Sequence, residues 1–255
     1  MRERKYFEKF IFFASFLVLS IYFFLFTGLF FAFDWKINLD SYRIVNAIKN
    51  SLLAAILSTF LAFIIGTPTA YFLSRYKHSI SNLIDTILEF PLIISPAALG
   101  ATVVIFFNTP LGQGFKDFFL FSFSGIVLAQ FLTVLGLFIR ILKSSIDQID
   151  PKYELIASLF GANKIQVFLY IVFPMSKKGL IAAIILSLAK SFGEFGATLM
   201  VAGSIAYKTE TLPIYLYYQL STANISQAIF SILILITIAF STIIIVKNYT
   251  NKTNI

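Results

Sequence analysis

Six long apolar runs occupy most of this chain, and they limit its fold more than any other feature. A bilayer core about 30 Å thick needs roughly 20 apolar residues per helix, and each run is about that long. The chain is 58% hydrophobic and 13% charged, which is typical of an integral membrane protein. We therefore expect an all-α membrane protein with about six transmembrane helices and short loops. The runs cover residues 10–32, 51–73, 83–107, 118–142, 179–203 and 228–246.

The arrangement of the runs predicts a single domain over residues 1–255, with a first helix at about 10–32 and a five-helix core over 50–246. The first run follows a basic start, as in a secretory signal peptide. Signal peptides have a shorter apolar region of about 7–15 residues, followed by a small-residue cleavage site. Because this run is longer and no such site follows it, we expect the first helix to be retained.

The positions of lysine and arginine predict which side each connecting segment faces. With the N-terminus inside, the inner segments are 1–9, 74–82, 140–178 and the tail after 246, and they hold most of these residues. Cytoplasmic loops carry such an excess. We therefore expect a multi-pass protein of the cell membrane with both termini in the cytoplasm. The net charge of +8 then reflects topology, and basic residues dispersed over loops predict no nucleic-acid partner.

The residue types present exclude several kinds of site. The chain has no cysteine, which excludes thiolate metal sites and cysteine nucleophiles, and its one histidine, His78, cannot build a metal site alone. No glycine-rich phosphate loop of the Walker type occurs, so the chain does not bind ATP through that motif. We expect no enzyme active site and no cofactor bound by this chain.

Residues 150–174 form a polar, glycine-containing segment between two apolar runs. Asp150 followed by proline is typical of a helix start, and Glu154 in the first turn favours the helix dipole. Gly161 or Asn163 could take the left-handed conformation that ends this helix, before a second helix begins. We predict a short helix–turn–helix on the cytoplasmic face, which either rests on lipid headgroups or binds a partner.

This segment resembles the EAA loop of ABC-importer permeases, which has Glu-Ala-Ala, a glycine a few residues later and a distal Ile-x-x-Pro. Leu155 and Ile156 stand in place of the glutamate and the first alanine, and Glu154 lies one position earlier. The resemblance implies the type I ABC-importer fold and two cytoplasmic P-loop ATPase subunits that bind the loop and carry ATP and Mg²⁺. Ala157, Gly161, Ile171 and Pro174 match the motif, and the implied ATPase-coupling residues are Glu154, Ala157, Ser158, Gly161, Ala162, Ile171 and Pro174.

A second stretch, residues 190–220, is similar to the signature of molybdate permeases. That signature has a Gly-Glu-Phe-Gly-Ala-Thr block, then Gly-x-Ile and Thr-x-Thr-Leu-Pro, and sulfate and tungstate permeases carry related blocks. The resemblance extends over about 50–240 and implies import of a tetrahedral oxyanion, with molybdate favoured by the Ala-Thr-Leu-Met run at 197–200. It further implies a pore between two copies of the chain and an extracytoplasmic binding protein that delivers the anion. The matching residues are Gly193, Glu194, Phe195, Gly196, Ala197, Thr198, Gly203, Ile205, Thr209, Thr211, Leu212 and Pro213.

Two charged residues are predicted inside the fifth apolar run. Lys190 lies near mid-bilayer, and Glu194 follows one helical turn later on the same face. Charges at that depth are costly unless they pair or face a polar interior. The two residues either form a self-neutralising pair that locks helix packing or belong to the translocation path. The candidates for the path or its gate are Lys190, Gly193, Glu194, Gly196 and Thr198.

Other features leave alternatives open. Pro68, Pro91 and Pro96 are predicted to bend the second and third helices. Residues 212–218 are too short to span the membrane, and they either anchor at the outer surface or help to receive the binding protein.

Two other classes of protein compete with the permease interpretation. A stand-alone secondary transporter would need carboxylates for a coupling ion within the spans, and Glu194 is the only one near mid-bilayer. A membrane enzyme would need metal ligands or a nucleophile–base set, and the sequence offers neither. Among permeases, sulfate and tungstate stay open as substrates, because selectivity resides largely in the binding protein.

Overall fold

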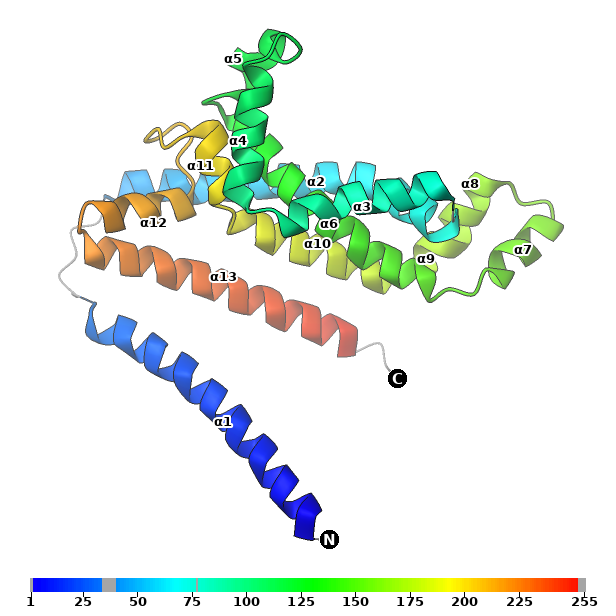
Figure 1. Ribbon diagram of the computed structural model, residues 1–255, viewed down its shortest axis with the longest axis horizontal. Coiled ribbons are helices and arrows are strands. Elements are labelled where there is room, and N and C mark those ends of the chain that lie inside the picture. The colour runs from blue at the N-terminus through cyan, green and yellow to red at the C-terminus, as the bar shows by residue number, and fades with distance from the viewer. Residues whose placement is uncertain (1, 34–39, 77, 252–255) are drawn as a thin grey trace.

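A computed structural model describes residues 2–33, 40–76 and 78–251 (Figure 1). All regular elements in these ranges are helical, which confirms the all-α prediction. The longer helices are α1 (Arg2–Phe31), α2 (Ser41–Arg75), α3 (Ser79–Ile93), α4 (Pro96–Phe107), α6 (Phe123–Asp147), α10 (Lys177–Phe192) and α13 (Ile225–Asn251). The shorter ones are η1 (Gln113–Phe115), α5 (Lys116–Phe119), α7 (Lys152–Leu159), α8 (Lys164–Val167), η2 (Phe168–Val172), α9 (Phe173–Met175), α11 (Gly196–Ala202) and α12 (Leu212–Ser221).

Within the described residues, four helices are long and apolar enough to cross a membrane alone, namely α1, α2, α6 and α13. The longest is α2, with 35 residues, and it contains Pro68. Two pairs of shorter helices reach the same length and hydropathy together but are sharply bent, α3 with α4 by 112° and the helical segment Lys164–Met175 with α10 by 73°. Counting each bent pair as one span gives up to six, which confirms a multi-pass membrane protein.

The apolar run 83–107, predicted as one span bent by prolines, is divided into two separate helices. α3 ends at Ile93, and α4 starts at Pro96 in a different direction. The Ser95 hydroxyl accepts a hydrogen bond of 3.2 Å from the backbone amide of Ala98, and Pro96 fills the first helical position. An N-cap serine followed by proline begins a helix. Pro96 therefore starts α4 instead of bending an existing helix.

The prediction of one continuous helix over residues 179–203 is wrong. α10 ends at Phe192, a non-helical stretch follows, and α11 begins at Gly196. Gly193 is the C-terminal cap of α10, and its backbone amide donates to the carbonyl oxygen of Ala189 at 3.2 Å. The fifth span is therefore interrupted inside the signature block.

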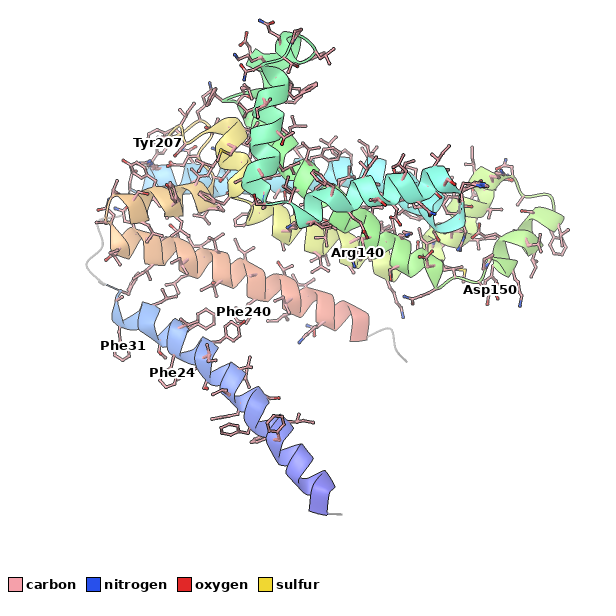
Figure 2. The ribbon with its side chains drawn as sticks, in the orientation of Figure 1. Phe24, Phe31, Arg140, Asp150, Tyr207 and Phe240 are labelled. Atoms are coloured by element: carbon pink, nitrogen blue, oxygen red, sulfur yellow. The ribbon has the colours of Figure 1, made fainter. Side chains whose placement is uncertain are left out.

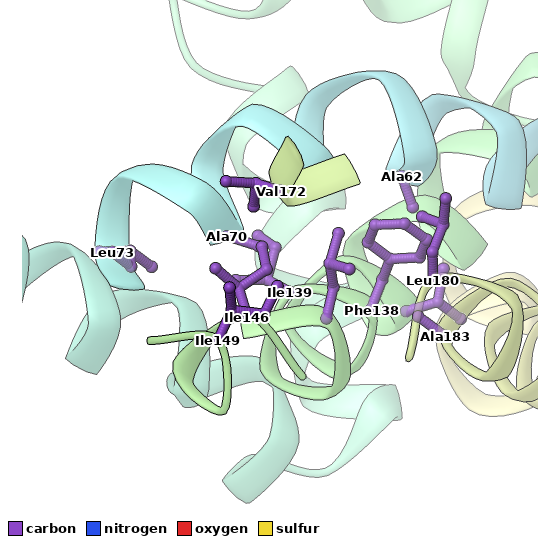
Figure 3. Close-up of a cluster of buried hydrophobic side chains, with 12 residues drawn as sticks. Ala62, Ala70, Leu73, Phe138, Ile139, Ile146, Ile149, Val172, Leu180 and Ala183 are labelled. Atoms are coloured by element: carbon purple, nitrogen blue, oxygen red, sulfur yellow. The ribbon is translucent and has the colours of Figure 1, made fainter. Parts of the chain in front are cut away.

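The main core lies where α2, α6 and α10 pack together (Figure 3). At its centre the Phe138 ring covers Gly66, and a β-carbon added at Gly66 would lie 2.6 Å from that ring. Small residues let helix backbones approach closely in membrane proteins, where apolar burial alone gives little driving force. The cluster contains Ala62, Ala70, Leu73, Val134, Phe138, Ile139, Leu142, Ile146, Ile149, Val172, Leu180 and Ala183.

Helix α1 lies apart from this bundle, alongside only the last helix (Figure 2). Among the side chains of its apolar window that the structure describes, none is buried within the chain. The rings of Phe26 and Phe240, whose centroids lie 6.4 Å apart, link it to α13.

The described structure has two ends along its long axis, named here after the short helices that mark them. The α7 end carries Asp150, and the α12 end carries Tyr207 (Figure 2). Helix α2 runs from one to the other, and the start of α1 and the finish of α13 both point toward the α7 end (Figure 1).

Candidate functional site

The segment 150–174 folds as the predicted helix–turn–helix. α7 begins at Lys152, and the Asp150 side chain accepts a hydrogen bond of 2.9 Å from the backbone amide of Lys152. After α8 the chain passes through the π-helical turn η2 into α9. Val167 and Val172, at the two sides of this turn, are both buried. A π turn places residues five apart on one face, so the turn brings both valines to the core.

The turn between α7 and α8 depends on one glycine. Gly161 has φ +88°, and nothing lies within 4 Å of a β-carbon added there, so the requirement is conformational and not steric. The backbone amide of Ala162 donates to the carbonyl oxygen of Ala157 at 3.1 Å, which closes the end of α7. Asn163, the alternative that the sequence allowed, instead caps the start of α8 and bonds Gln166.

The outer surface of this segment is apolar and exposed. Phe160 is 89% exposed, and neighbouring leucine and isoleucine side chains are more than half exposed. Exposed apolar side chains at this density in a short segment mark an interaction site. We name this set the apolar ridge, and it comprises Leu155, Ile156, Leu159, Phe160, Ile165 and Tyr170.

Glu154 connects α7 to the end of α2. Its carboxylate accepts hydrogen bonds from Arg75 Nε at 2.5 Å and from the Tyr71 hydroxyl at 2.8 Å. Arg75 also donates to the backbone carbonyl oxygens of Ile146 and Ile149, at 3.2 and 3.0 Å. We name the Arg75–Glu154 pair the inner clamp. From the sequence, Glu154 was expected to interact favourably with the dipole of its own helix, and its partners were not predicted. The available signal was the pair Tyr71 and Arg75, four positions apart on one helix face at the end of a span.

The other predicted coupling residues lie on the same segment with different surroundings. Ser158 is exposed and its hydroxyl bonds the Glu154 carbonyl oxygen at 2.8 Å. Ala157, Ala162 and Ile171 are half-buried, and Pro174 is exposed in α9. The structure thus gathers the residues named for coupling, and their role stays a prediction.

The second candidate site lies where the two interrupted spans cross. A β-carbon added at Gly196 would lie 3.0 Å from the backbone nitrogen of Ala97, so the start of α11 lies against the start of α4. Glu194 is 5% exposed, and its carboxylate accepts a hydrogen bond of 3.0 Å from the backbone amide of Ala197. A carboxylate at a helix N-terminus satisfies amides that have no partner in the helix. The signature glutamate therefore caps α11.

The predicted pairing of Lys190 and Glu194 on one helix face is wrong. α10 ends before Glu194 is reached, so the two residues are not one turn apart on a single helix. No ion pair joins them in the part of the chain that the structure describes, and Lys190 is exposed while Glu194 is buried. Gly193 is exposed, and Thr198 is fully buried with a hydroxyl that has no hydrogen-bond partner. Whether these residues line a path stays a prediction.

A polar contact inside the bundle was not found from the sequence. The hydroxyl groups of Ser58 and Ser191 lie 2.6 Å apart, and Ser191 donates to Gln130 Oε1 at 3.0 Å. All three side chains are fully buried and come from α2, α10 and α6. Hydrogen bonds of this kind hold membrane helices in register. In the sequence, Gln130 is a polar residue inside an apolar run, and this could have indicated a buried polar contact.

A charged cavity of about 210 Å³ opens between α3 and α6. Lys143 Nζ binds Asp85 at 2.6 Å on its wall, and Glu89, Arg140 and Asp147 also line it. The charges are of both signs and no ligand class follows from them. In the described ranges no three His, Asp or Glu side chains are placed to hold a metal ion.

If this segment couples the chain to an ATPase, as the resemblance implies, exchange of Gly161 for valine is expected to uncouple ATP hydrolysis from uptake while membrane insertion is kept. A β-branched residue at φ +88° costs about 1–3 kcal/mol of strain, so α7 and its ridge should shift. Uptake and ATPase rates of the reconstituted transporter measure this. Gly161→Asn is the control, because asparagine tolerates the left-handed region, and equal coupling in both variants would contradict the prediction.

A family model described as the inner membrane component of binding-protein-dependent transport systems matches residues 62–254. The probable transport system permease protein NifC of Clostridium pasteurianum is 30% identical over 76% of this chain and 70% of its own length. The molybdenum transport system permease protein ModB of Haemophilus influenzae is 31% identical over 72% of this chain and 82% of its own. The sulfate transport system permease protein CysT of Salmonella typhimurium is 31% identical over 70% and 66%.

The fold resembles that of a solved transporter. A chain from the crystal structure of a bacterial ABC transporter involved in the import of the acidic polysaccharide alginate aligns with a TM-score of 0.75. The alignment covers 100% of both chains at 18% identity, which bears on the fold alone.

Proposed function

We propose that this chain, which belongs to the inner membrane components of binding-protein-dependent transport systems, carries a tetrahedral oxyanion across the cell membrane, with molybdate as the substrate. Family membership makes it a permease subunit of an ABC importer with the type I fold, and it is a multi-pass membrane protein. The substrate, the partners and the symmetry of the pore are the proposed parts.

The substrate class is supported by the relatives together with the signature block. The relatives are named for transport of molybdenum and of sulfate, and molybdate and sulfate are both tetrahedral dianions. The Ala-Thr-Leu-Met run at 197–200 favours molybdate. Sulfate and tungstate are the alternatives within the same class.

The apolar ridge is the observation that supports an ATPase partner. We infer that two cytoplasmic P-loop ATPase subunits, which carry ATP and Mg²⁺, each bind one ridge, and that two copies of this chain enclose the pore. We infer that both chain termini lie in the cytoplasm, as the distribution of lysine and arginine predicts. The described start of α1 and finish of α13 each lie nearer the α7 end than the opposite end of the same helix does (Figure 1). A ridge on a short helix can act as a lever only if its contacts differ between the nucleotide states of the ATPase. The chain itself needs no cofactor for this role.

An extracytoplasmic binding protein would deliver the anion at the α12 end. The Glu194 carboxyl group already accepts a bond from the backbone of α11, and a carboxylate would repel an oxyanion, so we infer that it serves helix α11 and does not bind substrate. Weak interactions along the path favour release, which agrees with affinity residing mainly in the binding protein.

Calorimetry of the cognate binding protein with molybdate, tungstate and sulfate, followed by uptake into proteoliposomes, tests this function. We expect tight molybdate binding and molybdate uptake that needs this chain, the ATPase and the binding protein together. Uptake by the purified chain alone would support a secondary transporter instead. Preference for sulfate in both assays would overturn the substrate and leave the permease class intact.

A further inference from the structure

We propose that α2 links the ATPase side of the protein to the loop between α11 and α12 through an arginine–glutamate pair at each end, with Arg43 and Glu210 as positioning residues. This loop, residues 203–211, is called the outer loop. This inference rests on the proposed import function. The inner clamp is one of these pairs. The other lies at the α12 end, and we name the Arg43–Glu210 pair the outer clamp.

The outer clamp has the geometry of a strong ion pair. Arg43 Nε and one terminal nitrogen of the same guanidinium donate to the two carboxylate oxygens of Glu210, at 2.8 and 2.7 Å. Glu210 is 1% exposed, and the Arg43 guanidinium lies 4.2 Å from the centre of the Tyr218 ring. A planar fork that binds two oxygens and stacks on an aromatic face fixes both position and orientation.

The loop that carries Glu210 is held to α2 by further bonds. The Asn50 amide donates to the backbone carbonyl oxygens of Lys208 and Glu210, at 3.3 and 3.1 Å. The Ser51 hydroxyl accepts a bond of 2.7 Å from the backbone amide of Leu212, the first residue of α12. All of these partners on α2 lie within its first turns, so the loop follows the N-terminal end of that helix.

Helix α12 belongs to the same body and does not merely lie on the surface. Leu212, Pro213, Ile214 and Tyr215 are buried, and the Tyr215 hydroxyl donates to Gln227 Oε1 at 2.7 Å. Burial raises the pKa of the Tyr215 hydroxyl above its ordinary value, so this donor persists to more alkaline pH than that of an exposed tyrosine. The first turns of α2, the loop and α12 therefore form one unit.

The two clamps act on opposite ends of one helix. From Arg43 to Arg75 the helix rises about 48 Å at 1.5 Å per residue, which is enough to cross the bilayer. Each arginine lies on α2, and each glutamate lies on a segment from a distant part of the sequence, Glu154 on α7 and Glu210 on the outer loop. A displacement of α7 by an ATPase partner is passed to α2 by the inner clamp. The outer clamp passes the same displacement to the outer loop and α12, at the side where a binding protein arrives.

An ion pair suits this task better than apolar contact. Apolar side chains slide past one another at low cost, whereas a buried charge that loses its partner is penalised strongly. Paired charges therefore define one register between helix and loop. The same pairing at both ends, in a helix that runs the length of the bundle, is the observation that supports the proposal.

A double-variant cycle between the clamps tests the link in the complete transporter with ATPase and binding protein. Arg43→Lys keeps the charge but loses the two-point geometry, and Glu154→Gln keeps the shape but loses the charge. The readout is the ratio of ATPase rates with and without anion-loaded binding protein. We expect each single variant to lower this ratio about tenfold, within the usual range of coupling between sites. The ratio should fall no further in the double variant than in the single variant with the larger loss, because both changes break one link.

Thermal unfolding of the unaltered chain, the two single variants and the double variant separates this role from an effect on folding. Stability losses at sites this far apart should add, while the losses in ATPase stimulation should not. The charge exchange Arg43→Glu with Glu210→Arg should recover part of the ratio that Arg43→Glu alone removes. Asp85→Asn, which breaks the Lys143–Asp85 pair elsewhere, is the matched control and should leave the ratio unchanged.

Two results would overturn the link. One is a double variant whose loss is the product of the single losses, and the other is a ratio that falls only in proportion to thermal stability. The substrate proposal fails separately, in the unaltered transporter, if molybdate-loaded binding protein stimulates no ATPase activity. The cycle can then be measured with the anion that does stimulate it.

Discussion

Replacing Gly100 with valine is expected to abolish uptake and to destabilise the fold, because two backbones cross at this point. A β-carbon at Gly100 would lie 2.8 Å from the Cα and the carbonyl oxygen of Ala197 and from Cβ of Met200. Backbone atoms cannot move aside as a flexible side chain can, so α4 and α11 must separate. Overpacking typically costs about 1–3 kcal/mol, and the two further methyl groups of valine place this variant at the upper end.

The measurement is uptake in proteoliposomes together with the unfolding temperature of the purified chain. Gly114→Val is the control, since nothing lies within 4 Å of a β-carbon there and its φ is ordinary. Full uptake and unchanged unfolding in Gly100→Val would show that the crossing of the interrupted spans tolerates separation. That outcome would mean that transport does not require close packing of α4 against α11.

Loss of the inner clamp should have the second large effect. Glu154→Ala leaves the Arg75 guanidinium and the Tyr71 hydroxyl without the carboxylate that both bind. The Arg75 and Glu154 side chains are only 13% and 15% exposed, so water compensates poorly. We expect a loss of about 2 kcal/mol in unfolding free energy and a severe loss of ATP-driven uptake.

Lys152→Ala is the matched control on the same helix, because that side chain is 81% exposed and its pair with Asp150, at 3.6 Å, lies at the surface. Replacing both partners, as in Arg75→Met with Glu154→Leu, should recover stability but not uptake, since apolar contact fills the space without fixing the position of α7. Recovery of uptake in this double variant would mean that the clamp contributes to folding alone.

The sequence predicted the class of structure because that class depends on composition and length. Apolar runs of about 20 residues require helices in a bilayer, and Gly161 in its polar segment required a turn between two short helices. The two breaks were not predictable from hydropathy, since residues 94–95 and 193–195 lie within runs whose length and average hydropathy are those of a membrane span. Proline can bend a helix or begin one, and at Pro96 the preceding serine decided the outcome.

The clamps were not predictable for a different reason. Arg75 and Glu154 are 79 positions apart, and Arg43 and Glu210 are 167 apart. Periodicity in a single helix says nothing about partners at such distances. The pairing expected for Lys190 and Glu194 failed by the same logic, because it assumed that spacing along the chain sets the geometry across a helix end.

The π-helical turn Phe168–Val172 determines how α8, and α7 before it, are rotated relative to the helices that follow. An α-helix advances about 100° per residue, so an extra residue in one turn rotates the preceding segment by that amount about the helix axis. With Val167 and Val172 both held in the core, α7 and α8 can present their apolar ridge in one direction only. The number of residues in this stretch therefore determines the direction in which the apolar ridge faces. Residues could be exchanged along it more freely than inserted or removed, since a change of one residue would turn the ridge about a quarter of a revolution away from its partner.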